Sequence, residues 1–99
     1  MTIDKKQEGT TLTVSLNGRL DTTTAPQLEG ELRTAVEGIT ELIFDLKDLA
    51  YVSSAGLRVL LSAQKVMNRQ GNMTIRNASE EIMEIFEVTG FVDILNIES

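Results

Sequence analysis

Two adjacent serines, Ser53 and Ser54, stand where a short apolar run ends and a helical pattern begins, in the stretch YVSSAGLRVLLSAQK. A serine acts as a nucleophile only when a base takes its proton and nearby donors stabilise the oxyanion. The chain contains no histidine, and neither Lys47 nor Lys65 stands in an S-x-x-K relation to the serines. The sequence SSAGL also differs from the G-x-S-x-G nucleophile elbow. These residues therefore argue against a serine hydrolase.

The position of the two serines is compatible with two other roles. Serine is a preferred N-cap residue, because its hydroxyl accepts a hydrogen bond from a free backbone N–H of the first helical turn. One cap needs one serine, and a second serine adds little to capping. The same helix start carries free N–H groups and the positive end of the helix dipole, which together stabilise an added phosphate. The residues alone leave two alternatives open, plain capping or a phosphorylation switch that changes the surface charge.

Other patterns of reactive residues give no positive signal. The chain lacks both G-x-x-x-x-G-K-[ST] and G-x-G-x-x-G, and it contains no cysteine or histidine. Glu80, Glu84 and Glu87 share one face of a predicted helix, which indicates a solvated acidic surface rather than paired catalytic carboxylates. The arginines are too scattered to form the phosphate loop of a small acylphosphatase-like enzyme. The sequence therefore predicts a protein that is not an enzyme and has no cofactor or metal site.

The size and charge of the chain limit its class of partner. Its 99 residues fit one domain, which we expect to span residues 1–99. A net charge of −6 argues against binding to nucleic acid or to anionic membrane surfaces. The opening MTIDKKQEGTTLTV lacks the apolar run of a secretory signal, and no stretch approaches the ~20 apolar residues of a membrane span. We therefore expect a cytoplasmic protein without direct membrane insertion.

Hydrophobic periodicity predicts strands that alternate with helices. The predicted strands are residues 2–7, 11–16, 41–46 and 72–76, with residues 91–97 as a short edge strand. Asn17-Gly18 is expected to break or bulge the second strand, and Lys47-Asp48 to form a loop. Predicted helices start near Pro26 and are closed by Gly38, run over residues 54–70, and extend from a Ser79 cap to a Gly90 cap. This order predicts an α/β fold, a single mixed sheet of four to five strands with helices packed on it.

Two separated stretches of the chain resemble a known family. GRLDTTTAPQLEGEL is similar to the second strand, the G-x-L-D segment and the first helix of the anti-sigma factor antagonists, which are STAS domains. LIFDLKDLAYVSSAGLRVLLSAQKVMNRQG resembles the signature of the same family, and the stretch from Met73 to Phe91 also fits. The resemblance covers nearly the whole chain. It implies a small mixed sheet with helices packed on it, which agrees with the fold class that the periodicity predicts.

The resemblance also implies a switch. In the family, the unphosphorylated protein binds an anti-sigma factor, itself a serine kinase, and so releases a sigma factor. The kinase phosphorylates a serine at the start of the helix after the third strand, and a serine phosphatase resets the protein. The family motif is often D-S-[ST]-G-L, and Gly56-Leu57 matches its G-L. This places Ser54 on the phosphoacceptor and Ser53 on the aspartate, so that Ser53 is a rival hydroxyl.

The implied partner-binding surface surrounds the serines. Asp21 matches the aspartate of the G-x-L-D segment, whose loop lies near the acceptor in this fold. The residues expected to bind the partner are Asp21, Thr22, Tyr51, Ser53, Ser54, Ala55, Gly56 and Arg58. The replaced aspartate keeps an alternative open, in which the serines only cap the helix. The protein would then be an unphosphorylated STAS subunit of a membrane transport or signalling complex.

Overall fold

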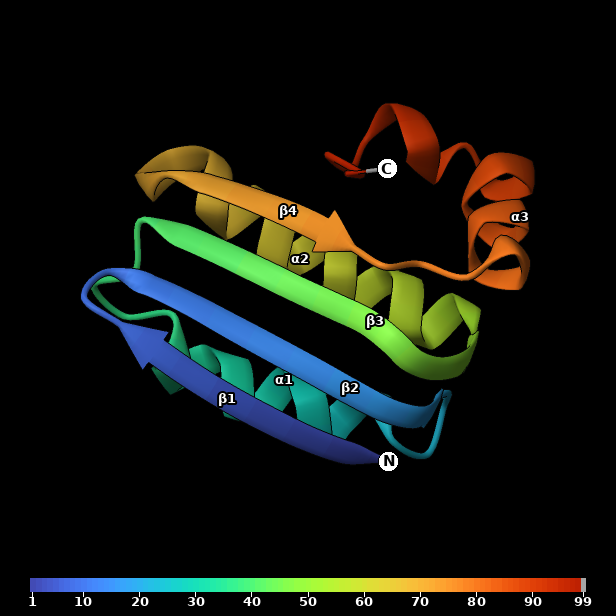
Figure 1. Cartoon of the computed structure of the whole chain (residues 1–99), viewed down its shortest axis with the longest axis horizontal. Coiled ribbons are helices and arrows are strands. Elements are labelled where there is room, and N and C mark those ends of the chain that lie inside the picture. Colours follow the sequence, from blue (N-terminus) through green and yellow to red (C-terminus); the bar gives the residue numbers. More distant parts are fainter. Residues whose placement is uncertain (99) are drawn as a thin grey trace.

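The computed structural model describes residues 1–98, which form four strands and three α-helices joined by short loops (Figure 1). The strands are β1 (Thr2–Glu8), β2 (Thr11–Leu20), β3 (Glu41–Val52) and β4 (Asn72–Arg76). The helices are α1 (Ala25–Ala35), α2 (Ser54–Gln70), α3 (Glu80–Thr89) and the short 3₁₀ helix η1 (Phe91–Asp93). The α/β class and the mixed sheet predicted from the periodicity are confirmed.

The strands lie in the sheet in the order β1-β2-β3-β4. β1 pairs antiparallel with β2, whereas β3 runs parallel to β2 and β4 runs parallel to β3. Parallel neighbours need a crossover connection, and α1 and α2 provide the two crossovers. Right-handed crossovers that advance in one direction place their helices on the same face of the sheet, and Figure 1 shows α1 and α2 behind it. The carboxyl ends of β2 and β3 therefore lie side by side, and each leads into the start of a helix.

The main core lies between the sheet and these two helices. Leu12, Val14 and Leu16 of β2 are buried, as their alternation predicted, and they share one cluster with Leu28 of α1 and Leu60 of α2. Full burial of such a side chain contributes about 1.5–3 kcal/mol. This packing holds the body of each crossover helix against the sheet and so determines where its first turn lies.

Both β2 and β3 are longer than predicted. Asn17-Gly18 does not break β2, although the pairing is irregular there as the alternative prediction of a bulge implies. Lys47-Asp48 is not a loop, because it lies within a paired strand. The pairing of β2 with β3 shifts register near each pair, so that β3 bulges and continues instead of stopping. Polar residues at an exposed bulge look like a loop in the sequence. The extension carries β2 and β3 to Leu20 and Val52, where the predicted site begins.

The carboxyl-terminal segment differs from the predicted edge strand over residues 91–97. It begins with the 3₁₀ helix η1, and Ile97 alone forms a bridge, parallel to Ile75 of β4. The predicted Gly90 cap is confirmed, because Gly90 has a φ of 80° and its N–H donates to the Glu87 carbonyl. Phe91, Val92, Leu95 and Ile97 of this segment pack on the core, whereas Ile94 is exposed.

The helices are amphipathic and not uniformly apolar. In α2, buried Leu57 and Leu60 alternate with exposed Arg58 and Lys65. Within residues 1–98, no helix is both long enough and apolar enough to cross a membrane.

Candidate functional site

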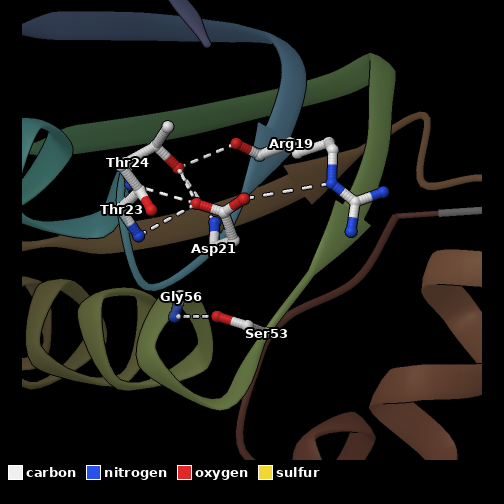
Figure 2. Close-up of polar contacts among 6 residues, drawn as sticks. All are labelled: Arg19, Asp21, Thr23, Thr24, Ser53 and Gly56. Atoms are coloured by element: carbon white, nitrogen blue, oxygen red, sulfur yellow. Dashed lines mark hydrogen bonds and ion pairs between the residues drawn. The ribbon is translucent and has the colours of Figure 1, made fainter.

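The two serines at the start of α2 have different environments. Ser53 is the N-cap, with an extended backbone (φ −89°, ψ 175°), and its hydroxyl accepts a hydrogen bond from the Gly56 N–H at 3.3 Å (Figure 2). Ser54 is the first residue of the helix and is exposed. Among the side-chain hydrogen bonds of residues 1–98, none involves the Ser54 hydroxyl. Of the two hydroxyls, Ser53 is therefore occupied by capping and Ser54 faces solvent.

Gly56 fixes the start of α2 against the end of β2. A Cβ atom at Gly56 would lie 2.7 Å from Leu20 Cγ and 2.9 Å from the Leu20 carbonyl oxygen, closer than side chains approach. The same carbonyl accepts a hydrogen bond from the Ser53 N–H at 2.8 Å. Gly56, predicted as a partner-binding residue, is buried. It positions the two serines, because only a residue without a side chain allows the helix to approach the strand this closely.

The loop after β2 is organised around one carboxylate. Asp21 Oδ1 accepts hydrogen bonds from the N–H groups of Thr23 at 3.0 Å and Thr24 at 3.1 Å. The Thr24 hydroxyl accepts from the Asp21 N–H at 2.9 Å and donates to the Arg19 carbonyl at 2.8 Å (Figure 2). This closed set of hydrogen bonds gives the loop before α1 a fixed shape and holds the carboxylate in place.

The surroundings of Asp21 favour its charged form. The hydrogen bond from the Thr24 backbone N–H has the largest effect and lowers the pKa of Asp21, while desolvation opposes it. The Thr23 N–H, the Thr24 hydroxyl and the positive charge of Arg19 lower this pKa further. The loop therefore presents a negative charge at neutral pH.

Arg19 connects this loop to β3. Its Nε lies 3.9 Å from Asp21 Oδ2, and its guanidinium carbon lies 4.5 Å from the centre of the Tyr51 ring. Arg19 and Tyr51 are register partners in the parallel pairing of β2 with β3. A cation above an aromatic face is attracted to it, by about 0.5–1 kcal/mol at an exposed site. Arg19 thus links the carboxylate after β2 with the tyrosine near the end of β3.

The predicted site residues come from two segments that the fold brings to one end of the sheet. Asp21 and Thr22 lie after β2, and the others lie at the end of β3 and in the first turns of α2. The exposed members are Thr22, Tyr51, Ser54 and Arg58, and the half-buried members are Asp21, Ser53 and Ala55.

Sequence reasoning missed Arg19, Thr23 and Thr24. A signal for the threonines exists, because an aspartate followed two and three residues later by hydroxyl residues is typical of a turn that leads into a helix. The contact between Arg19 and Tyr51 depends on the register of β2 and β3, which two irregularities shift. The sequence pattern does not encode that shift.

The described site lacks the side chains that nucleophilic and metal-dependent catalysis most often use. No histidine or cysteine exists in the chain, and residues 1–98 contain no cluster of acidic residues arranged to hold a metal ion. Activation of a serine hydroxyl requires a base that accepts its proton, and among the side-chain hydrogen bonds of residues 1–98 none joins the Ser54 hydroxyl to such a group.

Comparison with known proteins assigns the chain to a family. The STAS domain family matches residues 2–99. The chain belongs to the STAS family. The anti-sigma-B factor antagonist of Bacillus subtilis (strain 168) is 33% identical to this STAS domain over 98 residues, 98% of this chain and 90% of that protein. The anti-sigma-B factor antagonist of Listeria monocytogenes is 31% identical over 98 residues, 96% of this chain and 85% of that protein.

Solved structures share the fold of this STAS domain. The anti-sigma factor antagonist SpoIIAA in its unphosphorylated form matches with a TM-score of 0.78 at 18% identity, over 99% of this chain and 88% of that chain. SpoIIAA in its phosphorylated form matches with a TM-score of 0.77 at 19% identity, over 99% and 92%. An anti-sigma factor antagonist from Mycobacterium paratuberculosis matches with a TM-score of 0.87 at 21% identity, over 97% and 83%.

Proposed function

We propose that this STAS domain is an anti-sigma factor antagonist. It binds an anti-sigma factor with serine kinase activity, and so frees a sigma factor in the cytoplasm. Phosphorylation of Ser54 ends the binding, and a serine phosphatase restores it. The names of the Bacillus and Listeria relatives support the first part of this proposal. The protein acts as a binding partner in this scheme and carries no catalytic residue of its own.

The division of roles between the two serines carries the phosphorylation part of the proposal. Ser53 caps α2 through the Gly56 N–H, whereas Ser54 points to solvent at the first helical position. A kinase must reach the hydroxyl that it modifies, and modification of a capping hydroxyl would disturb the helix start. These environments favour Ser54 over its rival Ser53 as the acceptor.

The fold can accept a phosphate at this position without unfolding. The kinase would transfer the γ-phosphoryl group of ATP to Ser54 Oγ. A new O–P bond forms, the bond from Pγ to the β,γ-bridging oxygen breaks, the hydroxyl proton leaves and ADP is released. The product carries a charge of about −1.5 to −2 at pH 7. The N-terminal end of a helix stabilises such a charge, so the change is confined to the surface that the partner contacts.

The partner surface consists of the exposed groups around Ser54. Thr22, Tyr51 and Arg58 are exposed at this end of the molecule, and the Asp21 carboxylate is held beside them by its hydrogen bonds. A phosphate adds a second negative charge near Asp21. Like charges that face each other across an interface cost several kcal/mol, so the phosphate weakens the complex where an acidic group of the partner faces Ser54.

The test is phosphopeptide mapping after incubation with ATP and the serine kinases of the same organism. We expect phosphate on Ser54, its loss in Ser54→Ala, and its retention in Ser53→Ala. We also expect Ser54→Asp to weaken binding to the anti-sigma kinase while the thermal midpoint stays nearly unchanged at physiological salt, where the helix-dipole effect is screened. Equal binding by Ser54→Asp and wild type would show that charge at this position is not the switch.

One result would favour the alternative function, that of a constitutive subunit in a transport or signalling complex. If no kinase that binds the protein transfers phosphate to Ser53 or Ser54, Ser53 serves only as the helix cap and Ser54 is an unmodified surface residue. The protein would then be a constitutive STAS subunit, and it should co-purify with a transporter or sensor protein.

A further inference from the structure

Arg58 lies one helical turn after Ser54 and has no ionic partner. It is exposed in α2, and none of the ion pairs among residues 1–98 involves it. Residues four apart in a helix are neighbours on its surface. A guanidinium without a partner therefore lies beside the hydroxyl that we propose as the phosphoacceptor.

The same spacing already forms an ion pair elsewhere in the molecule. In α1, Arg33 Nη2 lies 3.3 Å from Glu29 Oε1, four residues earlier. The anion precedes the cation along the helix in this pair, which is the more favourable order. The pair of Ser54 and Arg58 repeats this order and spacing. It lacks only the anion.

The other cation at this end of the sheet is already engaged. The Arg19 guanidinium lies over the Tyr51 ring and close to Asp21. The first turn of α2 contains no acidic residue that could hold Arg58 instead. Of Arg19 and Arg58, only Arg58 is therefore free to take up a new negative charge on α2.

We infer that the phosphoryl group on Ser54 captures Arg58 within the same helix and so withdraws it from the partner surface. This inference rests on the proposed function and describes how the switch works. Arginine binds phosphate oxygens through two parallel N–H donors, and the phosphoryl group carries more negative charge than the carboxylate of the pair in α1. Phosphorylation then makes two changes together. It adds negative charge near Asp21, and it removes a free cation that an acidic group of the partner could have bound.

The inference can be tested on the protein alone. Phosphoserine is installed at position 54 by genetic encoding, so no kinase is required, and the phosphate is titrated by ³¹P NMR. The second pKa of an exposed phosphoserine is about 6. Asp21, Arg19 and the helix start also act on this phosphate, so the informative quantity is the change between variants. A captured Arg58 favours the dianionic phosphate and so lowers its second pKa. We therefore expect Arg58→Gln to raise this pKa by at least about 0.3. Arg58→Lys keeps the positive charge and should raise it less.

Arg69→Gln is the matched control, because Arg69 is exposed in the last turn of the same helix. It removes the same charge from α2 at a distance from Ser54, and we expect it to leave the phosphate pKa unchanged. If Arg58→Gln shifts this pKa no more than Arg69→Gln, the phosphate does not capture Arg58 and the inference is wrong.

Binding to the anti-sigma kinase separates this inference from the proposed function. We expect Ser54→Glu to weaken binding about tenfold or more in the wild-type background, and by a smaller factor in the Arg58→Gln background. Equal factors in the two backgrounds would overturn the role of Arg58 and leave the Ser54 switch intact. No effect of Ser54→Glu in either background would overturn the proposed function, whatever the phosphate pKa shows.

Discussion

The starts of α2 and α3 are capped in the same way. Ser53 Oγ accepts from the Gly56 N–H at 3.3 Å, and Ser79 Oγ accepts from the Ile82 N–H at 3.2 Å. Both serines have an extended backbone, and in both helices the donor is the third residue after the cap. The predicted cap at Ser79 is therefore confirmed, and it provides a reference for Ser53.

The residues after the two caps differ in charge. α3 continues with Glu80 and Glu81, which complement the positive end of the helix dipole, whereas α2 continues with Ser54 and Ala55. The comparison indicates that this fold places a permanent negative charge after the cap of α3 and leaves the same position of α2 neutral. Under the proposed function, a kinase adds the missing charge when the complex must dissociate.

The largest expected effect concerns the third residue after the cap, which is Gly56 in α2 and a fully buried Ile82 in α3. Gly56→Ala should destabilise the protein by about 1–3 kcal/mol, because the new methyl group overlaps Leu20. Gly30→Ala in α1 is the control, since nothing lies within 4 Å of its Cβ position. It should stabilise by about 0.5–1 kcal/mol. Urea denaturation measures both, and equal effects would mean that Gly56 does not set the approach of α2 to β2.

Removal of either cap should have the next largest effect. Ser53→Ala and Ser79→Ala each leave a backbone N–H of the first turn unpaired, so each should lower the free energy of unfolding by about 1 kcal/mol. Ser54→Ala removes no cap, and its effect should stay within about 0.5 kcal/mol. Thermal or urea denaturation of the three variants provides the comparison. A loss in Ser54→Ala as large as that in Ser53→Ala would contradict the division of roles between the serines.

Changing the charge after each cap should have smaller and opposite effects. Ser54→Glu gives α2 the residue type that α3 has, and should stabilise the protein by about 0.3–1 kcal/mol at low salt. Glu80→Gln removes the corresponding charge from α3 and should destabilise it by a similar amount. Both effects should shrink as the salt concentration rises. If both substitutions change stability in the same direction, the helix dipole does not explain the difference between the two starts.

The start of α1 differs again, and its contribution to stability is present at neutral pH and lost only in acid. Its N-cap Thr24 makes no capping hydrogen bond, and Asp21 accepts from the Thr23 and Thr24 N–H groups instead. The pKa of Asp21 is lowered in the folded state. Its contribution to stability is therefore complete above the ordinary aspartate pKa of about 3.9 and is lost as the pH falls through the lower value of the folded state. Urea denaturation at decreasing pH should show the difference between wild type and Asp21→Asn constant near neutrality and shrinking below about pH 4.

Periodicity predicted the elements whose pattern is local. Leu12, Val14 and Leu16 alternate as a half-buried strand must, and the helix over residues 54–70 was predicted with the bounds that the structure gives it. Prediction was wrong where the pattern depends on distant pairing. Lys47-Asp48 continues β3 because β2 supplies hydrogen-bonding partners across a bulge. Residues 91–97 begin with a 3₁₀ helix and meet β4 only through the bridge at Ile97.

Sequence reasoning named most of the residues that the fold brings together at the candidate site, but not the contacts between them. Ser53 and Ser54 are equally good caps by residue type, and the backbone geometry at the end of β3 decides that Ser53 is the cap. The reason for Gly56 lies in Leu20, which is distant in the sequence and close in space. The contact between Arg19 and Tyr51 depends on the strand register in the same way. The roles of Ser54, Asp21 and Arg58 toward a partner remain predictions that the experiments above address.

The contact between Gly56 and Leu20 also bears on how quickly a switch at Ser54 could act. The hydrogen bond from Ser53 to the end of β2 and the close approach at Gly56 hold the first turn of α2 against the strand. A phosphate added there would not have to wait for a loop to refold or a domain to close. Under the proposed mechanism, the delay between a signal and its effect would then be set by kinase and phosphatase turnover and by dissociation of the complex. No slow conformational step within the STAS domain would add to this delay.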